Sequence, residues 1–399
     1  MKPFGIVTSR VTELEKAHLL RVEDGNHGEY RPRTEEFVPD GVAFIRAADI
    51  SDGRVMFATA ERINETARLR IRKGIGHAFD VLLSHKGTVG KVAFASSDSP
   101  PFVCSPQTTF WRSLDHDVID PRFLFYYLLS ASFQNQLRSL KGETDMADYV
   151  SLSTQRQLVL DIPQIAVQRS ISKVLGVLDD KIEANRRLTT QLDVLGGEIF
   201  RALCSNGKDR LLHEVCEIVM GQSPPGISYN DTGLGLPLFQ GSTDFGSRFP
   251  TPRVYCTAGI RFAEPSDVLL SVRAPVGDLN VADRDCVIGR GVAAIRRRGA
   301  PSFAYHLIRS IRPRLATYED TGTVFSAINK AALAALPVTV PSESAIVSFE
   351  TIVGPMDKLA GSLSREIGCL AELRDLVLPR LISAAYRVGQ SEGTVEPVA

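Results

Sequence analysis

Several features are scarce or missing in this chain of 399 residues, and each absence excludes a class of protein. Its six cysteines are scattered and form no Cys-x-x-Cys pair, so we expect neither a disulfide framework nor a metal site. It has no run of about 18 apolar residues, which argues against a membrane-spanning helix. Its first residues lack the apolar region of a signal peptide, so we expect a cytoplasmic protein.

The formal net charge is zero, since 46 basic residues balance 46 acidic ones. This balance argues mildly against a protein that holds DNA by overall charge alone. The basic residues are clustered, however, and the clearest groups are Arg62, Arg68, Arg70, Arg72 and Lys73, and then Arg290, Arg296, Arg297 and Arg298. Local basic surfaces count for more than the sum in contacts with phosphates. The alternative for each cluster is an ordinary solvated surface.

The most informative feature that is present is an internal repeat. Residues 80–90 and 267–277 are identical at seven of eleven positions, and both begin Asp-Val-Leu-Leu-Ser. A long helical pattern follows each copy at a similar offset. The sequence therefore predicts a duplicated unit of one globular module and one long helix, which suits a target in two parts such as DNA.

The globular modules are expected at residues 1–163 and 207–341, with mixed strands and helices. In the first module, strands are expected at Val42–Ile45, Val81–Leu83, Val92–Phe94 and Thr108–Trp111. One helix is expected at Pro121–Leu140, with proline in its first turn.

The two connecting segments, 164–206 and 342–399, are expected to form a central and a distal spacer helix, the second ending in a polar tail. Apolar residues recur at steps of three and four over residues 165–203, which predicts a helix roughly 58 Å long. The same stripe recurs over Ile346–Arg387, where Pro355 and Pro379 could interrupt it. We expect an α+β fold, with two pseudo-symmetric modules separated by two long, antiparallel, coiled-coil-like helices.

The sequence contains none of the catalytic motifs that its look-alike segments suggest. Gly87–Lys91 has two residues between its glycines, where a phosphate-binding loop needs four. Ser223–Gly226 ends in glycine, where an amino-group methyltransferase needs an aromatic residue to stack on the flipped base. No Glu-x-Lys nuclease motif occurs. We therefore expect no catalytic residues and no cofactor in this chain.

The order of several motifs resembles the DNA-specificity subunit of type I restriction-modification enzymes over nearly the whole chain. In the second module the motifs are Gly221–Gly226, Gln240-Gly241, Leu270–Gly277 and Ile288–Gly291. In the first module they are Asp24–Gly28, Phe44–Arg46, Asp80–Ser84 and Ser105–Gln107. The spacer is similar at Ile162–Gln168, whereas the distal copy departs because its Pro341-Ser-Glu-Ser lacks the glutamine.

This resemblance implies that the modules are target-recognition domains, each binding one half of a bipartite, asymmetric site in double-stranded DNA. The helix pair would set the length of the gap between the halves. Two modification (methyltransferase) subunits would dock on the chain, with two restriction (motor-nuclease) subunits as optional members of this phage-defence complex. S-adenosylmethionine, ATP and Mg²⁺ would belong to those partner subunits.

Candidate DNA-binding residues are those whose side chains can reach base edges or phosphates from loops. In the first module the candidates are Asn26, His27, Arg46, His85, Lys86, Thr88, Lys91 and Gln107. In the second module they are Gln222, Ser223, Tyr229, Gln240, Arg273 and Arg290. As alternatives, Arg273 or Arg290 could pair with Asp267 or Asp285. Asp80 and Asp267 are expected to cap turns.

Three rival functions remain open at this point. One is a specificity subunit of another defence-type adenine methyltransferase system. The others are an enzyme with an unrecognised active site and a coiled-coil scaffold without DNA contacts. The target sequence and the gap length are not predicted.

Overall fold

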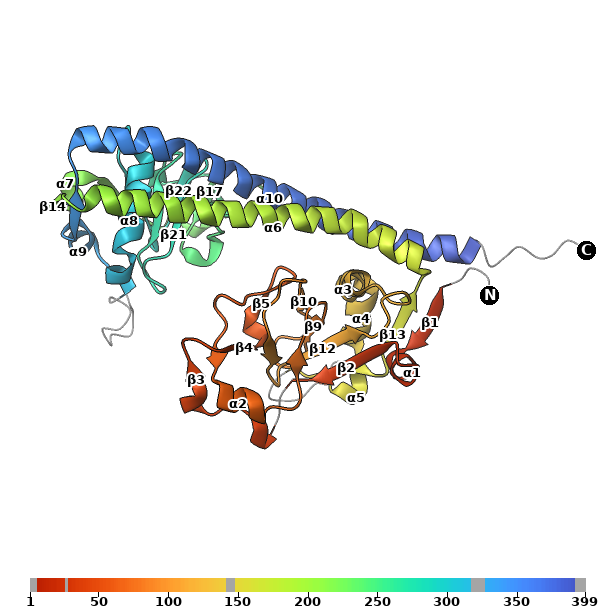
Figure 1. Ribbon diagram of the computed structural model, residues 1–399. Coiled ribbons are helices and arrows are strands. Elements are labelled where there is room, and N and C mark those ends of the chain that lie inside the picture. Colours follow the sequence, from red (N-terminus) through yellow and green to blue (C-terminus); the bar gives the residue numbers. More distant parts are fainter. Residues whose placement is uncertain (1–5, 26–27, 141–147, 317–326, 392–399) are drawn as a thin grey trace, which may run out of the picture. The chain divides into compact units, whose positions relative to one another are not determined.

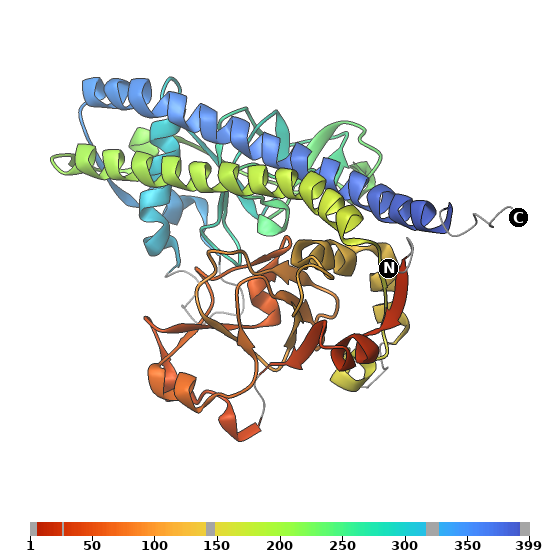
Figure 2. The same cartoon turned by 45° about the vertical axis from the view of Figure 1, so that its right-hand side comes forward.

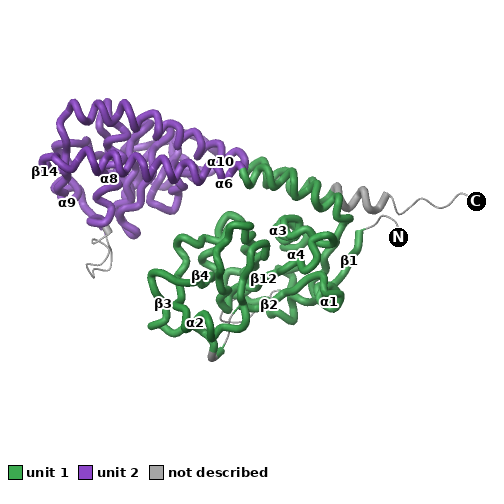
Figure 3. Tube along the Cα trace, in the orientation of Figure 1, with its two compact units in different colours: residues 1–180, 371–399 green, residues 181–370 purple. Residues whose placement is uncertain are grey.

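The computed structural model describes residues 6–25, 28–140, 148–316 and 327–391. The chain divides into two compact units, residues 1–180 with 371–399 and residues 181–370 (Figure 3). Each unit therefore combines one globular module with a part of both long helices. Among the described residues, no helix has the length and apolar content needed to cross a membrane.

The first module is built on two sheets of short strands (Figure 1). One sheet has the order β2 (Leu20–Asp24), β12 (Thr108–Ser113), β9 (Val81–Ser84), β10 (Val92–Phe94), β6 (Arg54–Val55) and β5 (Ile50–Ser51). The other has the order β3 (Phe37–Val38), β7 (Arg62–Ile63), β4 (Val42–Ile45), β11 (Phe102–Cys104) and β8 (Ile75–Gly76). A pair of strands, β1 (Val7–Arg10) and β13 (Val159–Ile162), leads to the first long helix.

The helices of this module are short. They are α1 (Val11–Lys16), α2 (Glu65–Arg70), α3 (Pro121–Leu129), α4 (Ala131–Ser139) and α5 (Leu152–Gln155). The prediction of a single helix at 121–140 is wrong in one respect, because this segment forms two helices, α3 and α4. Ser130 between them has an extended backbone, and its hydroxyl accepts a hydrogen bond from the Phe133 amide. A serine that caps a new helix in this way ends the previous one.

The second module repeats the plan. One sheet has the order β15 (Glu217–Met220), β23 (Val292–Arg296), β20 (Val268–Ser271) and β21 (Leu279–Val281). The other has the order β16 (Tyr229–Asn230), β18 (Tyr255–Cys256), β17 (Leu236–Phe239), β22 (Cys286–Ile288) and β19 (Phe262–Ala263). Strands β14 (Lys208–Leu211) and β24 (Pro337–Val340) pair as β1 and β13 do. Helices α7 (Leu212–Val215), α8 (Pro301–Ala316) and α9 (Lys330–Ala334) complete it.

The duplication extends to single ion pairs. In the first module Arg112 on β12 donates two hydrogen bonds to the buried Asp80 carboxylate, at 2.6 and 2.7 Å. In the second, Arg296 on β23 donates one to the buried Asp267 carboxylate at 2.7 Å. The sequence prediction of two modules with a common scaffold is confirmed.

The long helices are α6 (Ile165–Cys204) and α10 (Glu343–Ser391), and α10 continues through Pro355 and Pro379. They run side by side and antiparallel within each unit (Figures 1 and 2). In the first unit, Ile171 and Leu175 of α6 share a core with Leu378 and Ile382 of α10. In the second unit, Phe200 of α6 shares a core with Phe349 of α10, among others. The expected antiparallel pair is confirmed.

Candidate functional site

The turn that follows the repeated Asp-Val-Leu-Leu-Ser strand is closed by the same hydrogen bonds in both modules, and the second turn also contains a cis peptide bond, Ala274–Pro275. In the first, the carbonyl of Ser84 accepts a hydrogen bond from the Gly90 amide at 2.9 Å, and its hydroxyl accepts one from the Lys91 amide at 2.9 Å. In the second, Ser271 accepts from the Gly277 and Asp278 amides at 3.0 and 2.8 Å. Gly90 and Gly277 both have φ +98°, a conformation that favours glycine. A buried strand thus presents a closed turn whose tip residues are free to differ.

Three of the predicted residues of the first module are exposed around this turn. Lys86 and Thr88 lie within it, and Gln107 lies on the neighbouring turn. The two turns are joined because the Gln107 carbonyl accepts a hydrogen bond from the His85 amide at 2.9 Å. The segment after β2 adjoins them, since a Cβ on Gly25 would lie 1.8 Å from the Ser105 carbonyl oxygen. Asn26 and His27 lie outside the described residues.

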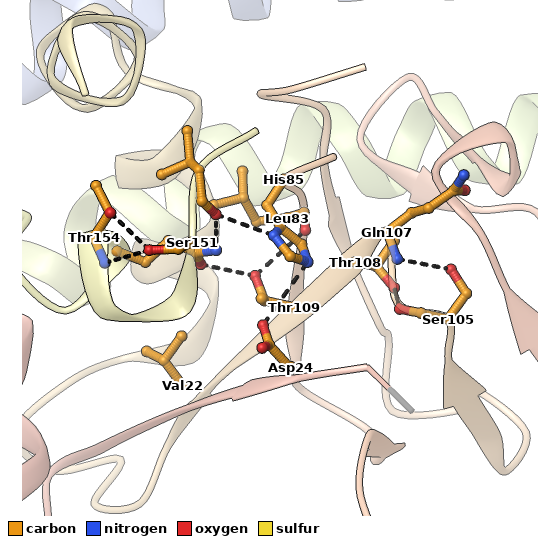
Figure 4. A network of polar contacts seen from close by, with 12 residues as sticks. Val22, Asp24, Leu83, His85, Ser105, Gln107, Thr108, Thr109, Ser151 and Thr154 are labelled. Carbon is orange, nitrogen blue, oxygen red and sulfur yellow. Dashed lines mark hydrogen bonds and ion pairs between the residues drawn. The ribbon is translucent and has the colours of Figure 1, made fainter. Parts of the chain in front are cut away.

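His85 is buried beneath this surface and does not lie on it. Figure 4 shows its ring within a network of polar contacts that includes Asp24. Its side chain is fully buried, with Nδ1 3.0 Å from the Val150 carbonyl oxygen and Nε2 3.8 Å from an Asp24 carboxylate oxygen. The Tyr149 ring packs beside it, with ring centroids 5.5 Å apart. A side chain enclosed on all sides cannot contact a DNA groove, so the expected DNA contact of His85 does not fit this structure. His85 instead joins the turn to the segment before α5.

Lys91 and Arg46 are also engaged within the protein. The half-buried Lys91 donates a hydrogen bond from Nζ to the Ala47 carbonyl at 3.2 Å. The Arg46 guanidinium lies 3.2 Å from a carboxylate oxygen of Glu61. Both cations therefore hold neighbouring loops, and only Arg46, whose side chain is 40% exposed, also has substantial access to solvent.

In the second module, three loops meet at glycines. A Cβ on Gly221 would lie 2.1 Å from the Gly289 carbonyl oxygen, and one on Gly291 would lie 2.2 Å from the Gln240 carbonyl oxygen. The loops that follow β15, β17 and β22 therefore touch through their backbones, which no larger residue would allow. The Val272 amide donates to the Gly291 carbonyl at 2.9 Å, and this bond adds the turn after β20 to the group.

The polar residues predicted for this module lie on these loops. Gln222, Gln240, Arg273 and Arg290 are exposed, and neither arginine side chain has a partner in the part of the chain that the structure describes. Asp267 pairs with Arg296 instead, so the alternative pairing of Asp267 with Arg273 or Arg290 is excluded. The Ser223 hydroxyl accepts a bond from the Arg290 amide at 3.4 Å. Tyr229 is half-buried, and its hydroxyl donates to the Pro224 carbonyl at 2.9 Å, which gives it a place in the loop's internal structure.

The repeated aspartates cap turns, as the sequence predicts. The Asp80 carboxylate accepts a hydrogen bond from the His77 amide at 2.7 Å, and Asp267 accepts one from the Glu264 amide at 2.8 Å. Burial raises the pKa of Asp267 above its ordinary value, although the Glu264 amide and the Arg296 guanidinium oppose this shift. These groups fix the start of the central strand and leave its far end to carry the exposed turn.

Each module thus presents amide, hydroxyl and cationic side chains on adjoining loops, and these are the donors that bind base edges and phosphates. The described residues contain no cluster of His, Cys, Asp or Glu able to hold a metal ion. One nearby group was not among the predicted site residues. The Cys104 amide donates to the Gly74 carbonyl at 2.7 Å, so the basic run ending at Lys73 adjoins the Ser105–Gln107 turn. The basic cluster in the sequence was the signal for it.

Comparison with known proteins finds similarity to one family. A family model described as the type I restriction modification DNA specificity domain matches residues 28–193. A Methanocaldococcus jannaschii protein assigned as the MjaX type I restriction enzyme specificity subunit is 27% identical over 378 residues, covering 87% of this chain and 88% of the relative. Over most of its length the chain is therefore similar to a type I restriction enzyme specificity subunit.

Two further proteins are similar to this chain. The MjaVIII specificity subunit of the same organism is 24% identical over 207 residues, which are 49% of this chain and 46% of that subunit. The crystal structure of a type I restriction-modification S subunit from M. genitalium matches with a TM-score of 0.58 at 16% identity, covering 96% of this chain and 97% of that one. The last comparison supports the fold.

The glycine contacts give a direct prediction. Gly221→Ala should destabilise the second module by about 1–3 kcal/mol, because its Cβ would overlap the Gly289 carbonyl and force the loops apart. Chemical denaturation measures the change. Gly226→Ala is the matched control, since no atom lies within 4 Å of its added Cβ. Equal stability of the two variants would show that the loops need no such close approach.

Proposed function

We propose that this chain is the non-catalytic DNA sequence-specificity subunit of a type I restriction-modification complex, with each module reading one half of a bipartite, asymmetric site in double-stranded DNA. The observation that carries the proposal is the pair of matched turns after β9 and β20. Their backbone hydrogen bonds are the same, whereas the exposed residues differ, with Lys86 and Thr88 in one and Arg273 in the other. Two half-sites of different sequence require a common scaffold with different exposed side chains.

The chain would also be the scaffold of the complex. Two modification subunits, carrying S-adenosylmethionine, would dock on it, and two restriction subunits, carrying ATP and Mg²⁺, would join where the system has them. Catalysis would belong to the partners, and the cell compartment would be the cytoplasm.

The most direct test maps methylated adenines across the genome in cells with and without this gene. We expect one bipartite motif, two short specified sequences separated by an unspecified gap, to lose its methylation when the gene is deleted. An unchanged set of methylated motifs in the deletion strain would reject the proposed function. Restoring the gene from a plasmid is the control, and it should restore that motif alone.

A role for Lys86 in phosphate binding is testable through salt. Lys86→Ala should weaken binding of the full chain to duplex DNA and reduce the slope of log K against log salt by about 1, because one phosphate contact is lost. Lys16→Ala removes an equal charge from an exposed position on α1 and should leave the slope unchanged. A slope identical to wild type for Lys86→Ala would show that Lys86 does not contact phosphate.

The proposed role of the long helices concerns the gap. α6 is continuous over Ile165–Cys204, so removing four facing residues from α6 and from α10 should shorten each by about 6 Å, or roughly two base pairs. The methylated motif of cells carrying this variant should keep both specified halves and have a shorter gap. The same gap in variant and wild type would contradict the idea that the helices set it.

A further inference from the structure

The first module carries a short basic segment that the residues proposed above do not include. Residues 62–76, which contain β7, α2 and β8, hold four arginines and one lysine against one glutamate. Arg72 and Lys73 are exposed and Arg68 is half-buried. None of these three side chains has a hydrogen bond or an ion pair with any residue that the structure describes.

The remaining cation of α2 anchors the segment. The Arg70 guanidinium donates two hydrogen bonds to the Glu36 carboxylate, at 2.7 and 2.5 Å. This pairing lowers the pKa of Glu36 to about 2, so the carboxylate stays charged at neutral pH. At the other end, the Asn64 side chain caps α2 by accepting from the Ala67 amide at 2.9 Å. Arg70 is therefore committed to holding α2, and Arg68, Arg72 and Lys73 are left for another partner.

The segment adjoins the candidate DNA-binding turns. The Gly74 amide donates to the Glu23 carboxylate of β2 at 2.8 Å, and the Gly74 carbonyl accepts from the Cys104 amide at 2.7 Å. β2 leads into Gly25, and β11 leads into the turn at Gln107. These two hydrogen bonds of the Gly74 backbone, one with the Glu23 side chain and one with the Cys104 backbone, fix Lys73 beside the surface on which Gln107 and Lys86 are exposed. In Figure 1, α2 lies beside β3 and β4 of the same module.

The second module has no counterpart. Its β19 pairs with β22 as β8 pairs with β11, and the Ile288 amide donates to the Arg261 carbonyl at 3.0 Å, as Cys104 does to Gly74. The position of Lys73 is therefore taken by Ile260, which is 41% exposed. Phe262, at the position of Ile75, is 46% exposed. In this described part of the chain, no helix precedes β19 where α2 precedes β8. The segment 249–263, which aligns with 62–76, holds two cations, Arg253 and Arg261, and Arg253 is paired with Asp244.

We propose that Arg68, Arg72 and Lys73 form a phosphate clamp of the first module that the second module lacks. The inference rests on the proposed function. Guanidinium and ammonium groups without internal partners bind phosphate oxygens and displace condensed counterions, whereas exposed isoleucine and phenylalanine do not. The two modules then hold DNA by different means. The first contributes most of the salt-sensitive affinity, and the second depends more on contacts that salt does not screen.

The test uses the full chain and a mixed-sequence DNA duplex, because phosphate contacts do not depend on sequence. The triple variant R68A/R72A/K73A should lower the slope of log K against log salt by about 2–3, measured by fluorescence anisotropy between about 50 and 200 mM salt. Arg261→Ala in the second module should lower it by no more than about 1. Unfolding temperatures of the variants should match wild type, because none of these side chains is bonded within the described chain.

The matched control is K16A/R138A/K173A, which removes the same charge from exposed or surface positions on α1, α4 and α6. It should leave the slope at the wild-type value. An equal drop in control and triple variant would reduce the effect to overall charge and overturn the clamp, as would an unchanged slope in the triple variant. Failure of the wild-type chain to bind any duplex would also overturn the clamp, whereas the proposed function is tested separately by the methylated motif in cells that lack the gene.

Discussion

The structure depends on the apolar stripes of α6 and α10, because neither module completes its core without them. In the first unit the core takes Ile171 and Leu175 from α6 and Leu378 and Ile382 from α10. In the second it takes Phe200 from α6 and Phe349 and Val353 from α10. Removing such surfaces from water is the main source of folding free energy, so the helices are structural parts of both units and not simple linkers. Partly buried polar contacts, such as the Arg374–Asp179 pair and the Asn185–Glu366 hydrogen bond, then favour one register of the helix pair.

Within each module, the constraint is a central strand fixed at one end and variable at the other. Asp80 and Asp267 anchor the strand through a turn amide and an arginine. The serine at the far end closes the turn through its own carbonyl and hydroxyl. Since these bonds use backbone groups and one serine, closure does not depend on the exposed side chains of Lys86, Thr88 and Arg273. Those side chains can differ between the two modules while the turn stays closed.

The sequence was sufficient for the features that repeat. Seven shared positions in eleven and the steps of three and four in the long helices predicted the duplication and the helix pair. It was insufficient where distant residues decide. His85 follows a strand that is buried throughout, and Val150, 65 residues away, covers it, so no local pattern distinguishes it from exposed Lys86. Ser130 sits in an otherwise helical pattern, and only its cap to Phe133 reveals two helices. For the site, the sequence predicted the loops. It did not predict that Arg46 pairs with Glu61 or that Lys91 donates a hydrogen bond to the Ala47 carbonyl.

The zero net charge acquires a physical meaning once the cations are placed. Arg70, Arg112 and Arg296 are bound to carboxylates and contribute no field that a distant polyanion would sense. Arg72, Lys73, Arg273 and Arg290 are exposed and unpaired among the described residues, so they carry the local positive potential. Under the proposed function, a neutral chain with unpaired cations on these exposed loops would avoid holding DNA indiscriminately by long-range attraction. Its binding would then have to come from close contacts, and close contacts are the ones that distinguish one sequence from another.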